Sequence, residues 1–436
     1  MRKNKLNFLS QFVIVFGLLA PVSVAADTLK DALSLVYRNN PTILSFRASL
    51  RASDEDIAIA QAAFRPAIQL TAGVSGTGKN AASGYNVGPV ANISISQNIF
   101  AGFADVNNLS ATQMQVLAKQ AKLRKLEQDQ LLLALSTYAN VASMRDIIDI
   151  RKKDVEAMKA RVQSNKASFS IGEGTRTAVS QAEAALARSR AALSQSLATL
   201  DSLEASYQQI IGVKPGKLDP PKVYFSLPNS LEEMIEIALT NHPAVVSSGF
   251  VVRSLEHVVK ANIGRLLPSV NVSAGVDYRN NAFIDANWTD KVTSSVGVNV
   301  VIPLYQGGRS TAQVRKAKQN LSAAIFDLDA ARLSVRQSVI EAWSKLQGAK
   351  AALVANKANI EASKIAMEGV LAQNKVGEAS TLDVLVQRNS LTDARIAYIN
   401  NQRDIIIASY NLLAAMGQFT VEVIGLNVER YDPDAT

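Results

Sequence analysis

The sequence contains no cysteine and only two histidines, His242 and His257, among 436 residues. The absence of cysteine excludes disulfide bonds, thiol chemistry and the lipid-modified cysteine of bacterial lipoproteins. Histidine is the commonest metal ligand and the usual proton carrier near neutral pH, so two copies leave little material for either role. No metal-ligand cluster, glycine-rich phosphate loop or nucleophile–histidine spacing occurs. We therefore expect no catalytic residues, no metal and no cofactor.

The sequence also lacks concentrated charge and long apolar runs. The formal net charge is +9, and the basic residues are dispersed along helical patterns. Because nucleic-acid binding requires a concentrated basic face, no nucleic-acid partner is expected. After the first 26 residues there is no window of about 18 apolar residues, the length that a transmembrane helix requires. If the mature chain enters a membrane, it is expected to do so as a β-barrel.

Residues 1–25 have the composition of a secretory signal peptide. Three basic residues open the chain, a short apolar stretch follows over 8–19, and small residues occupy 23–25. Cleavage is expected after Ala25 or Ala26, which lowers the formal net charge of the mature chain to +6. An N-terminal membrane anchor is the alternative, but the apolar stretch is short for crossing a bilayer.

The mature chain repeats itself. The segment LKDALSLVYRNNP at 29–41 recurs as LEEMIEIALTNHP at 231–243, and PAIQLTAGV at 66–74 recurs as PSVNVSAGV at 268–276. Farther along, IGEGT, which ends at Thr175, is answered by VGEAS, which ends at Ser380. The matching segments occur in the same order in both halves and at a nearly constant spacing, which indicates a tandem duplication. The units are repeat 1 at 26–213 and repeat 2 at 231–417, with a proline-rich connector at 214–230 and a tail at 418–436.

Each unit is expected to contain a helix, two strands, a long helix and a further helix. The strands alternate apolar and small polar residues, and the long helices lack proline and carry apolar residues at helical spacing. About 65 residues at ~1.5 Å each make a rod near ~100 Å long. The expected ranges are strands 67–77 and 89–100 with helices 104–169 and 175–211, then strands 269–279 and 292–304 with helices 308–375 and 380–416.

A glycine followed by a hydroxyl residue ends each long rod. Gly172 precedes Thr175, and Gly377 precedes Ser380. Glycine at a helix end with a hydroxyl N-cap is typical of a helical hairpin turn. Ser380 and Asp383 also have the spacing of a capping box, with aspartate at the third helical position.

Three isolated residues are assigned structural roles. His242 precedes Pro243 and is expected to lie at a helix end, whereas His257 is expected to be exposed on a helix. Trp288 lies between the strands of the second pair, where it is expected either at the membrane surface or as a plain exposed aromatic.

The four strands impose a condition on assembly. A soluble sandwich shows the same alternation, but the small uncharged polar face and the strand length of about ten residues favour a membrane barrel. Four strands cannot close a barrel, because the smallest membrane barrels use eight, and open edges in lipid are prohibitively costly. Several copies must therefore contribute, and the sequence leaves two, three or four open.

This order of elements resembles the TolC-type outer membrane efflux proteins over essentially the whole mature length. The residues that carry the resemblance are the paired NNP and NHP openings, the strand starts at Pro66 and Pro268, the FAGF and YQGGR segments, and the VGEAST-LDVL turn that begins at Val376. The resemblance implies a mixed α/β membrane protein: a homotrimer whose twelve antiparallel strands form one barrel, continued by an α-helical barrel of coiled-coil helices. It also implies the outer membrane, with its lipid around the barrel, and a long periplasmic extension.

The same resemblance implies partners and a cargo. The expected partners are a periplasmic adaptor protein and an inner-membrane pump or ABC transporter. The exported cargo is either small molecules, such as drugs, detergents and toxins, or secreted proteins, and the sequence does not distinguish these.

In that family the pore constriction includes inward acidic residues just after the turn of the second repeat. Asp383 matches the first of them, which implies a ring of three carboxylates, whereas Val386 occupies the position of the second. The alternative is that Asp383 is only a first-turn helix acid, favoured by the helix dipole. Arg176, in the first turn, could pair with an acid and latch the closed hairpins, or be a solvated surface arginine.

The leading hypothesis is therefore a passive exit duct that is opened by partner proteins. A non-conducting coiled-coil protein that links envelope layers is the alternative, but it does not explain the four amphipathic strands. A membrane-embedded enzyme is disfavoured because no constellation of active-site residues is present.

Overall fold

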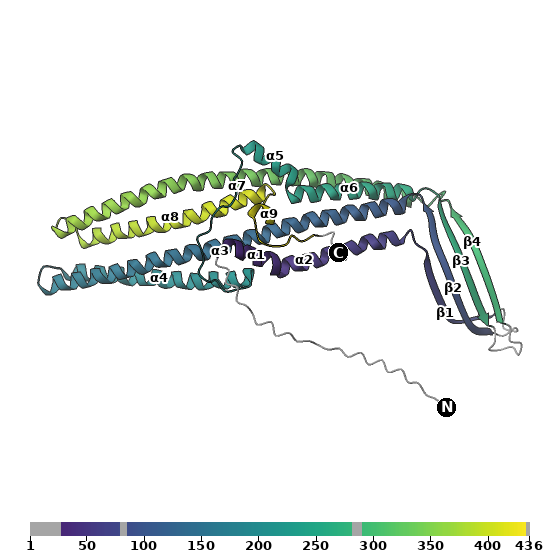
Figure 1. Ribbon diagram of the computed structural model, residues 1–436, viewed down its shortest axis with the longest axis horizontal. Coiled ribbons are helices and arrows are strands. Elements are labelled where there is room, and N and C mark those ends of the chain that lie inside the picture. The colour runs from purple at the N-terminus through teal and green to yellow at the C-terminus, as the bar shows by residue number, and fades with distance from the viewer. Residues whose placement is uncertain (1–27, 79–84, 281–289, 433–436) are drawn as a thin grey trace, which may run out of the picture.

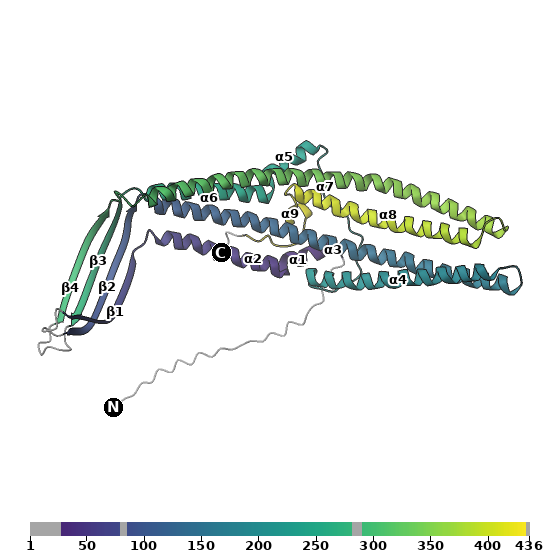
Figure 2. The same ribbon diagram turned by 180° about the vertical axis from the view of Figure 1, so that it is seen from behind.

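The computed structural model describes residues 28–78, 85–280 and 290–432, which form a long helical rod with a β-sheet at one end (Figures 1 and 2). The expected signal peptide, Trp288 and the last four residues of the tail lie outside the described residues. No helix in the described part of the chain is both long and apolar enough to cross a membrane.

Both repeats use the same elements in the same order. Repeat 1 contains α1 (Leu29–Asn39), α2 (Pro41–Ala62), β1 (Ala67–Gly78), β2 (Tyr85–Ala101), α3 (Ala104–Ser170) and α4 (Arg176–Ile211). Repeat 2 contains α5 (Leu231–Asn241), α6 (Pro243–Gly264), β3 (Ser269–Asn280), β4 (Asp290–Val301), α7 (Arg309–Lys375) and α8 (Thr381–Ala415). The short helix α9 (Val421–Ile424) follows.

The single helix expected before each strand pair is wrong, because each repeat has two helices there. Asn40 and His242 adopt extended backbone conformations and separate α1 from α2 and α5 from α6. A residue before proline avoids the helical region, and both residues precede a proline. Each then caps the next helix: Asn40 Oδ1 accepts from the Thr42 amide at 2.9 Å, and His242 Nδ1 accepts from the Ala244 amide at 3.2 Å.

The strands form one antiparallel sheet in the order β1-β2-β3-β4. The two repeats therefore meet between β2 and β3, and β1 and β4 are the edges. β2 begins earlier than the expected residue 89. β4 ends at Val301 rather than at residue 304, and Pro303, which cannot donate a ladder hydrogen bond, follows its end.

The main hydrophobic core lies midway along the rod, where α1, α3, α4, α5, α7, α8 and α9 meet. Two fully buried tyrosines also fix the proline-rich connector to this core. Tyr138 donates to the carbonyl of Asp219 at 2.8 Å, and Tyr410 donates to the carbonyl of Lys222 at 2.9 Å. The connector is thus held against both long hairpins and is not a free linker between two domains.

Two glycines allow a close approach between the repeats, beside the sheet. Gly102, between β2 and α3, has φ of +62°, and Gly264 ends α6. A Cβ built on Gly264 would lie 2.2 Å from the carbonyl oxygen of Gly102, and one built on Gly102 would lie 2.0 Å from the oxygen of Gly264. Only glycine fits at either position without moving the backbone.

Because the His242 imidazole is buried at the bend between α5 and α6, we expect the protein to lose stability in acid. His242 is only 7% exposed, and burial, with a further contribution from the charge of Lys125, lowers its pKa from 6.5 to about 4. Because its pKa is lower in the folded chain, His242 binds a proton more readily in the unfolded chain. The contribution of neutral His242 to stability is therefore fully present above pH 6.5 and is lost as the pH falls towards 4. Over that window the free energy of unfolding should fall by about 3 kcal/mol per chain. Thermal unfolding at pH 7.5 and at pH 4.5 measures the effect.

Repeat 1 supplies the matched control for this measurement. His242→Asn installs the residue that occupies the corresponding cap, Asn40, and retains an acceptor for the Ala244 amide. The variant should fold at pH 7.5 and lose less stability than the wild type on acidification. An equal loss in both proteins would show that His242 does not titrate as described.

Candidate functional site

The two helical hairpins end at the tip of the rod, opposite the sheet (Figure 1). The hairpin α3–α4 turns at Gly172, with φ of +79°, and the hairpin α7–α8 turns at Gly377, with φ of +83°. Thr175 caps α4 by accepting from the Ala178 amide at 3.1 Å, and Ser380 caps α8. These are the four residues that the sequence predicted for the turns, and the structure gives both turns the same backbone design.

Asp383 lies in the first turn of α8, where it completes a capping box with Ser380. Its carboxylate accepts from the Ser380 amide at 2.8 Å and from the Ser380 hydroxyl at 2.7 Å, and its own amide donates to that hydroxyl at 3.2 Å. The side-chain and backbone hydrogen bonds from Ser380 lower the pKa of Asp383. The carboxylate is exposed and ionised at neutral pH, and its place in a pore constriction stays a prediction.

The exposed surface of α8 beside Asp383 is apolar. Leu382 is 48% exposed and Val386 is 55% exposed, whereas Val384 and Leu385 are buried against neighbouring helices. A tip surface with one acid between apolar side chains differs from the two acidic positions that the family resemblance implies.

Arg176 begins α4 and is exposed. Among the described residues its guanidinium has neither an ion pair nor a hydrogen bond. No acid of the described residues serves as its partner, and the latch at Arg176 stays a prediction.

The strongest polar link between the two hairpins lies farther from the tip, around Asp154 of α3. Asp154 is 4% exposed and accepts hydrogen bonds from three side chains. Arg388 Nε of α8 donates to it at 3.1 Å, Thr392 Oγ1 of α8 at 3.4 Å and Ser189 Oγ of α4 at 2.7 Å. This cluster, called the Asp154 tie below, joins α3 and α4 of repeat 1 to α8 of the second hairpin.

The Asp154 tie has no local signal in the sequence. Asp154 and Arg388 are 234 positions apart, and each reads locally as an ordinary charged residue on a helical surface. A burial prediction for α3 would have found an acid among apolar neighbours, but nothing local identifies its partner.

The sheet has one apolar and one polar face, as its register shows. Ile68, Ile95, Ala274 and Val296 form a row across the four strands on one face. On the other face, Gln69, Ser94, Gly275 and Ser295 form the neighbouring row. The apolar side chains at the two edges are open to the surroundings, since Ile68 is 71% exposed and Val296 is 83% exposed.

The described residues contain no group of three or more acidic or histidine side chains placed to hold a metal ion. His242 serves as a helix cap. His257 is half-buried, with Nδ1 3.1 Å from Asn107 Oδ1, and is not the exposed residue that was expected. It lies at the contact between α6 and α3, where neighbouring side chains cover it.

Comparisons with known proteins agree with this geometry. The outer membrane efflux protein family matches residues 32–213 and 234–418, one segment in each repeat. The chain is 37% identical to outer membrane efflux protein BepC of Brucella suis biovar 1 (strain 1330), over 94% of this chain and 89% of BepC. It is 26% identical to outer membrane protein TolC of Vibrio cholerae, over 91% and 92%. The solved structure of CusC shares the fold with a TM-score of 0.80 at 16% identity, covering 90% of this chain and 92% of CusC.

Proposed function

Because this chain belongs to the outer membrane efflux protein family, we propose that three copies of it form one passive duct from the periplasm to the exterior. The family consists of outer membrane channels, which are not enzymes, and they work as the outer membrane component of efflux and secretion systems with an adaptor and a pump. The duct exports small molecules or secreted proteins, and its partners supply the energy.

The two-faced sheet is the observation that carries the proposal. Its apolar face suits lipid, and its polar face, made largely of small uncharged side chains, suits a water-filled lumen. The edges β1 and β4 have unpaired backbone groups within one chain, and such groups are costly in a bilayer. Pairing β4 of one copy with β1 of the next removes both edges, and three copies give twelve strands.

The helices support the same head-to-tail contact. Within the chain, α6 of repeat 2 packs along α3 of repeat 1 (Figures 1 and 2). By the internal duplication, α2 of a second copy should pack along α7 in the same way. The free face of α7 carries an exposed apolar seam at seven-residue spacing, formed by Phe326, Leu333 and Ile340. Such spacing is typical of a coiled-coil contact, which a neighbouring copy would cover.

The tip of the rod is the proposed inner end of the duct. In a ring of three copies, the second hairpins would bring three Asp383 carboxylates to one level, with Val386 beside each of them. Charged rings in a pore favour counter-ions, so this ring would give a preference for cations. The Asp154 tie would hold the hairpins in their closed arrangement, and the adaptor and pump would oppose it.

Single-channel conductance in planar bilayers tests the duct and the position of Asp383 together. The wild type should conduct with a small conductance and prefer cations. Asp383→Ala should raise the conductance and reduce the cation preference by about two- to threefold, because a ring of three charges is removed.

Ser380→Ala is the matched control, since it breaks the same capping box but retains the carboxylate. It should cost about 1 kcal/mol of stability and leave the ion preference unchanged. If both variants conduct like the wild type, the duct stands and Asp383 lies outside the constriction. Assembled protein that never conducts, even when the Asp154 tie is broken, would favour the non-conducting bridge between envelope layers.

A further inference from the structure

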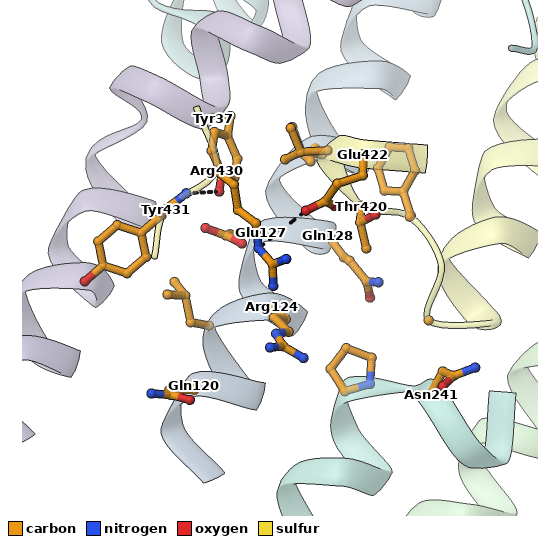
Figure 3. A pocket seen from close by; sticks show the side chains of 16 residues that line it. Tyr37, Gln120, Arg124, Glu127, Gln128, Asn241, Thr420, Glu422, Arg430 and Tyr431 are labelled. Carbon is orange, nitrogen blue, oxygen red and sulfur yellow. Dashed lines mark hydrogen bonds and ion pairs between the residues drawn. The ribbon is translucent and has the colours of Figure 1, made fainter. Parts of the chain in front are cut away.

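A cavity of about 380 Å³ lies midway along the rod, where five parts of the chain meet (Figure 3). Its walls come from α1, from α3, from the bend between α5 and α6, from the turn after α8 together with α9, and from the C-terminal tail. The volume is at the lower end of the range for small-molecule sites. Every wall belongs to one chain, so the cavity is formed without a second copy.

Three of the four charged residues that line the cavity have ion-pair partners. Glu127 pairs with Arg47 at 2.8 Å, and Glu422 pairs with Arg430 at 3.4 Å. Arg124 is the remaining charged residue of the lining, and its guanidinium has no ion pair among the described residues. With Arg47, these groups are three arginines and two glutamates, and the charge of Arg124 acts on the carboxylates of both Glu127 and Glu422.

A buried donor lies in the wall of the same space. Gln128, one helical turn after Arg124 on α3, is 3% exposed, and its Nε2 has no hydrogen-bond partner among the described residues. Figure 3 shows the ends of the Arg124 and Gln128 side chains projecting into the cavity from the same helix. A buried amide donor without an acceptor is unfavourable, so a ligand that supplies an acceptor there is favoured.

The rest of the lining provides an apolar surface. Leu123 and Leu131 of α3 and Pro243 of α6 lie on one side, and Phe419, which is 1% exposed, lies after α8. Sites for small molecules typically combine such apolar walls with a few convergent polar groups. The ligand that fits has one negative charge, acceptor oxygens and a compact apolar body.

The internal duplication shows that this polar pair is specific to repeat 1. At the repeat spacing that relates Thr175 to Ser380, Arg124 corresponds to Asp329 and Gln128 corresponds to Leu333. Leu333 is 69% exposed on α7 and lines none of this cavity. The two donors are therefore not a feature common to both long helices.

We propose that this cavity is a binding site for a small organic carboxylate. Arg124 and Gln128 donate to the carboxylate oxygens, and the apolar body lies against Leu123, Leu131 and Phe419. The site is separate from the lumen and the tips, and it does not rest on the proposed duct.

Binding of 4-fluorobenzoate to the full mature protein in lipid nanodiscs, followed by ¹⁹F NMR, tests the site. The neutral isostere 4-fluorobenzamide and empty nanodiscs are the controls for partitioning into lipid. The benzoate should bind saturably, with one site per chain, and the benzamide should bind at least about tenfold more weakly, because it lacks the charge that Arg124 recognises.

Two substitutions locate the binding. Arg124→Gln should weaken benzoate binding by about tenfold or more, and Gln128→Leu by about fivefold. Gln128→Leu removes an unpartnered buried donor and installs the residue found in repeat 2, so it should fold at least as stably as the wild type. Arg395→Gln, which removes an exposed charge from α8, should bind like the wild type.

Three results would overturn the site: no saturable benzoate binding, equal binding of benzoate and benzamide, or binding that Gln128→Leu and Arg124→Gln both leave unchanged. Conductance is measured separately, so failure of the site and failure of the duct give different signatures.

Discussion

Gly264→Ala is expected to lower the free energy of unfolding by about 3 kcal/mol per chain and to reduce the yield of assembled protein. The added Cβ would lie 2.2 Å from the Gly102 carbonyl oxygen and 3.1 Å from the Ala104 amide nitrogen. Both neighbours are backbone atoms at the junction between the sheet and the helices, so no side-chain rotation can relieve the overlap. The measurement is thermal or urea unfolding of the purified oligomer, together with the oligomer fraction after extraction.

Gly249→Ala is the control within the same helix. A Cβ at Gly249 meets nothing within 4 Å, and alanine is the better helix former, so this variant should gain about 0.5–1 kcal/mol. Opposite signs for the two substitutions would establish that close approach, and not helix propensity, selects glycine at 264. Equal effects would contradict the contact between Gly102 and Gly264.

Asp154→Asn is expected to lower stability by about 2–4 kcal/mol and to raise the single-channel conductance. The substitution removes the charge that holds Arg388 and weakens the acceptor shared by Ser189 and Thr392. Since Asp154 is 4% exposed, loss of its charge leaves a partly buried arginine without its counter-ion. The hairpins should then separate more readily, which bilayer conductance measures directly.

A double-mutant cycle with Arg388→Gln tests whether the two residues act as a pair. The double variant should be destabilised by clearly less than the sum of the single variants, because either change alone already breaks the ion pair. Asp329→Asn is the control, because the Asp329–Arg332 pair of α7 is more than half exposed and should contribute less than about 1 kcal/mol. Additive effects at Asp154 and Arg388, or a conductance equal to that of the wild type, would contradict a closing role.

The sequence predicts the repeated elements well because their signals are local. Alternation with period two identifies all four strands, and the absence of proline over more than sixty residues identifies α3 and α7. Glycine followed by a hydroxyl cap gives both hairpin turns, and the Ser380–Asp383 spacing gives the capping box that the structure contains. These patterns depend on neighbouring residues, so tertiary packing has little to change.

The features missed from the sequence depend on distant residues. The Asp154 tie and the Gly102–Gly264 approach each join residues from different repeats. The cavity beside Arg124 needs the tail to return over repeat 1, where the Tyr431 amide donates to the Tyr37 hydroxyl at 3.1 Å. The bend at His242 has a local signal, the following proline, which predicts a helix end at His242 but does not predict that a second helix begins directly after it.

The equal length of the two long helices has a consequence for how such a protein can change in evolution. α3 and α7 each contain 67 residues, so both hairpins reach the same distance from the sheet. A deletion confined to one hairpin would shorten that hairpin by ~1.5 Å for each residue removed from each of its two helices, and the two hairpin tips would no longer lie at the same level. Paired deletions of seven residues in each arm of both hairpins would preserve the coiled-coil phase and shorten both hairpins equally by about 10 Å. Natural length variants whose two hairpin tips stay level should therefore have insertions or deletions of equal size in both repeats. The common length of the two hairpins would then set how far the protein extends into the periplasm.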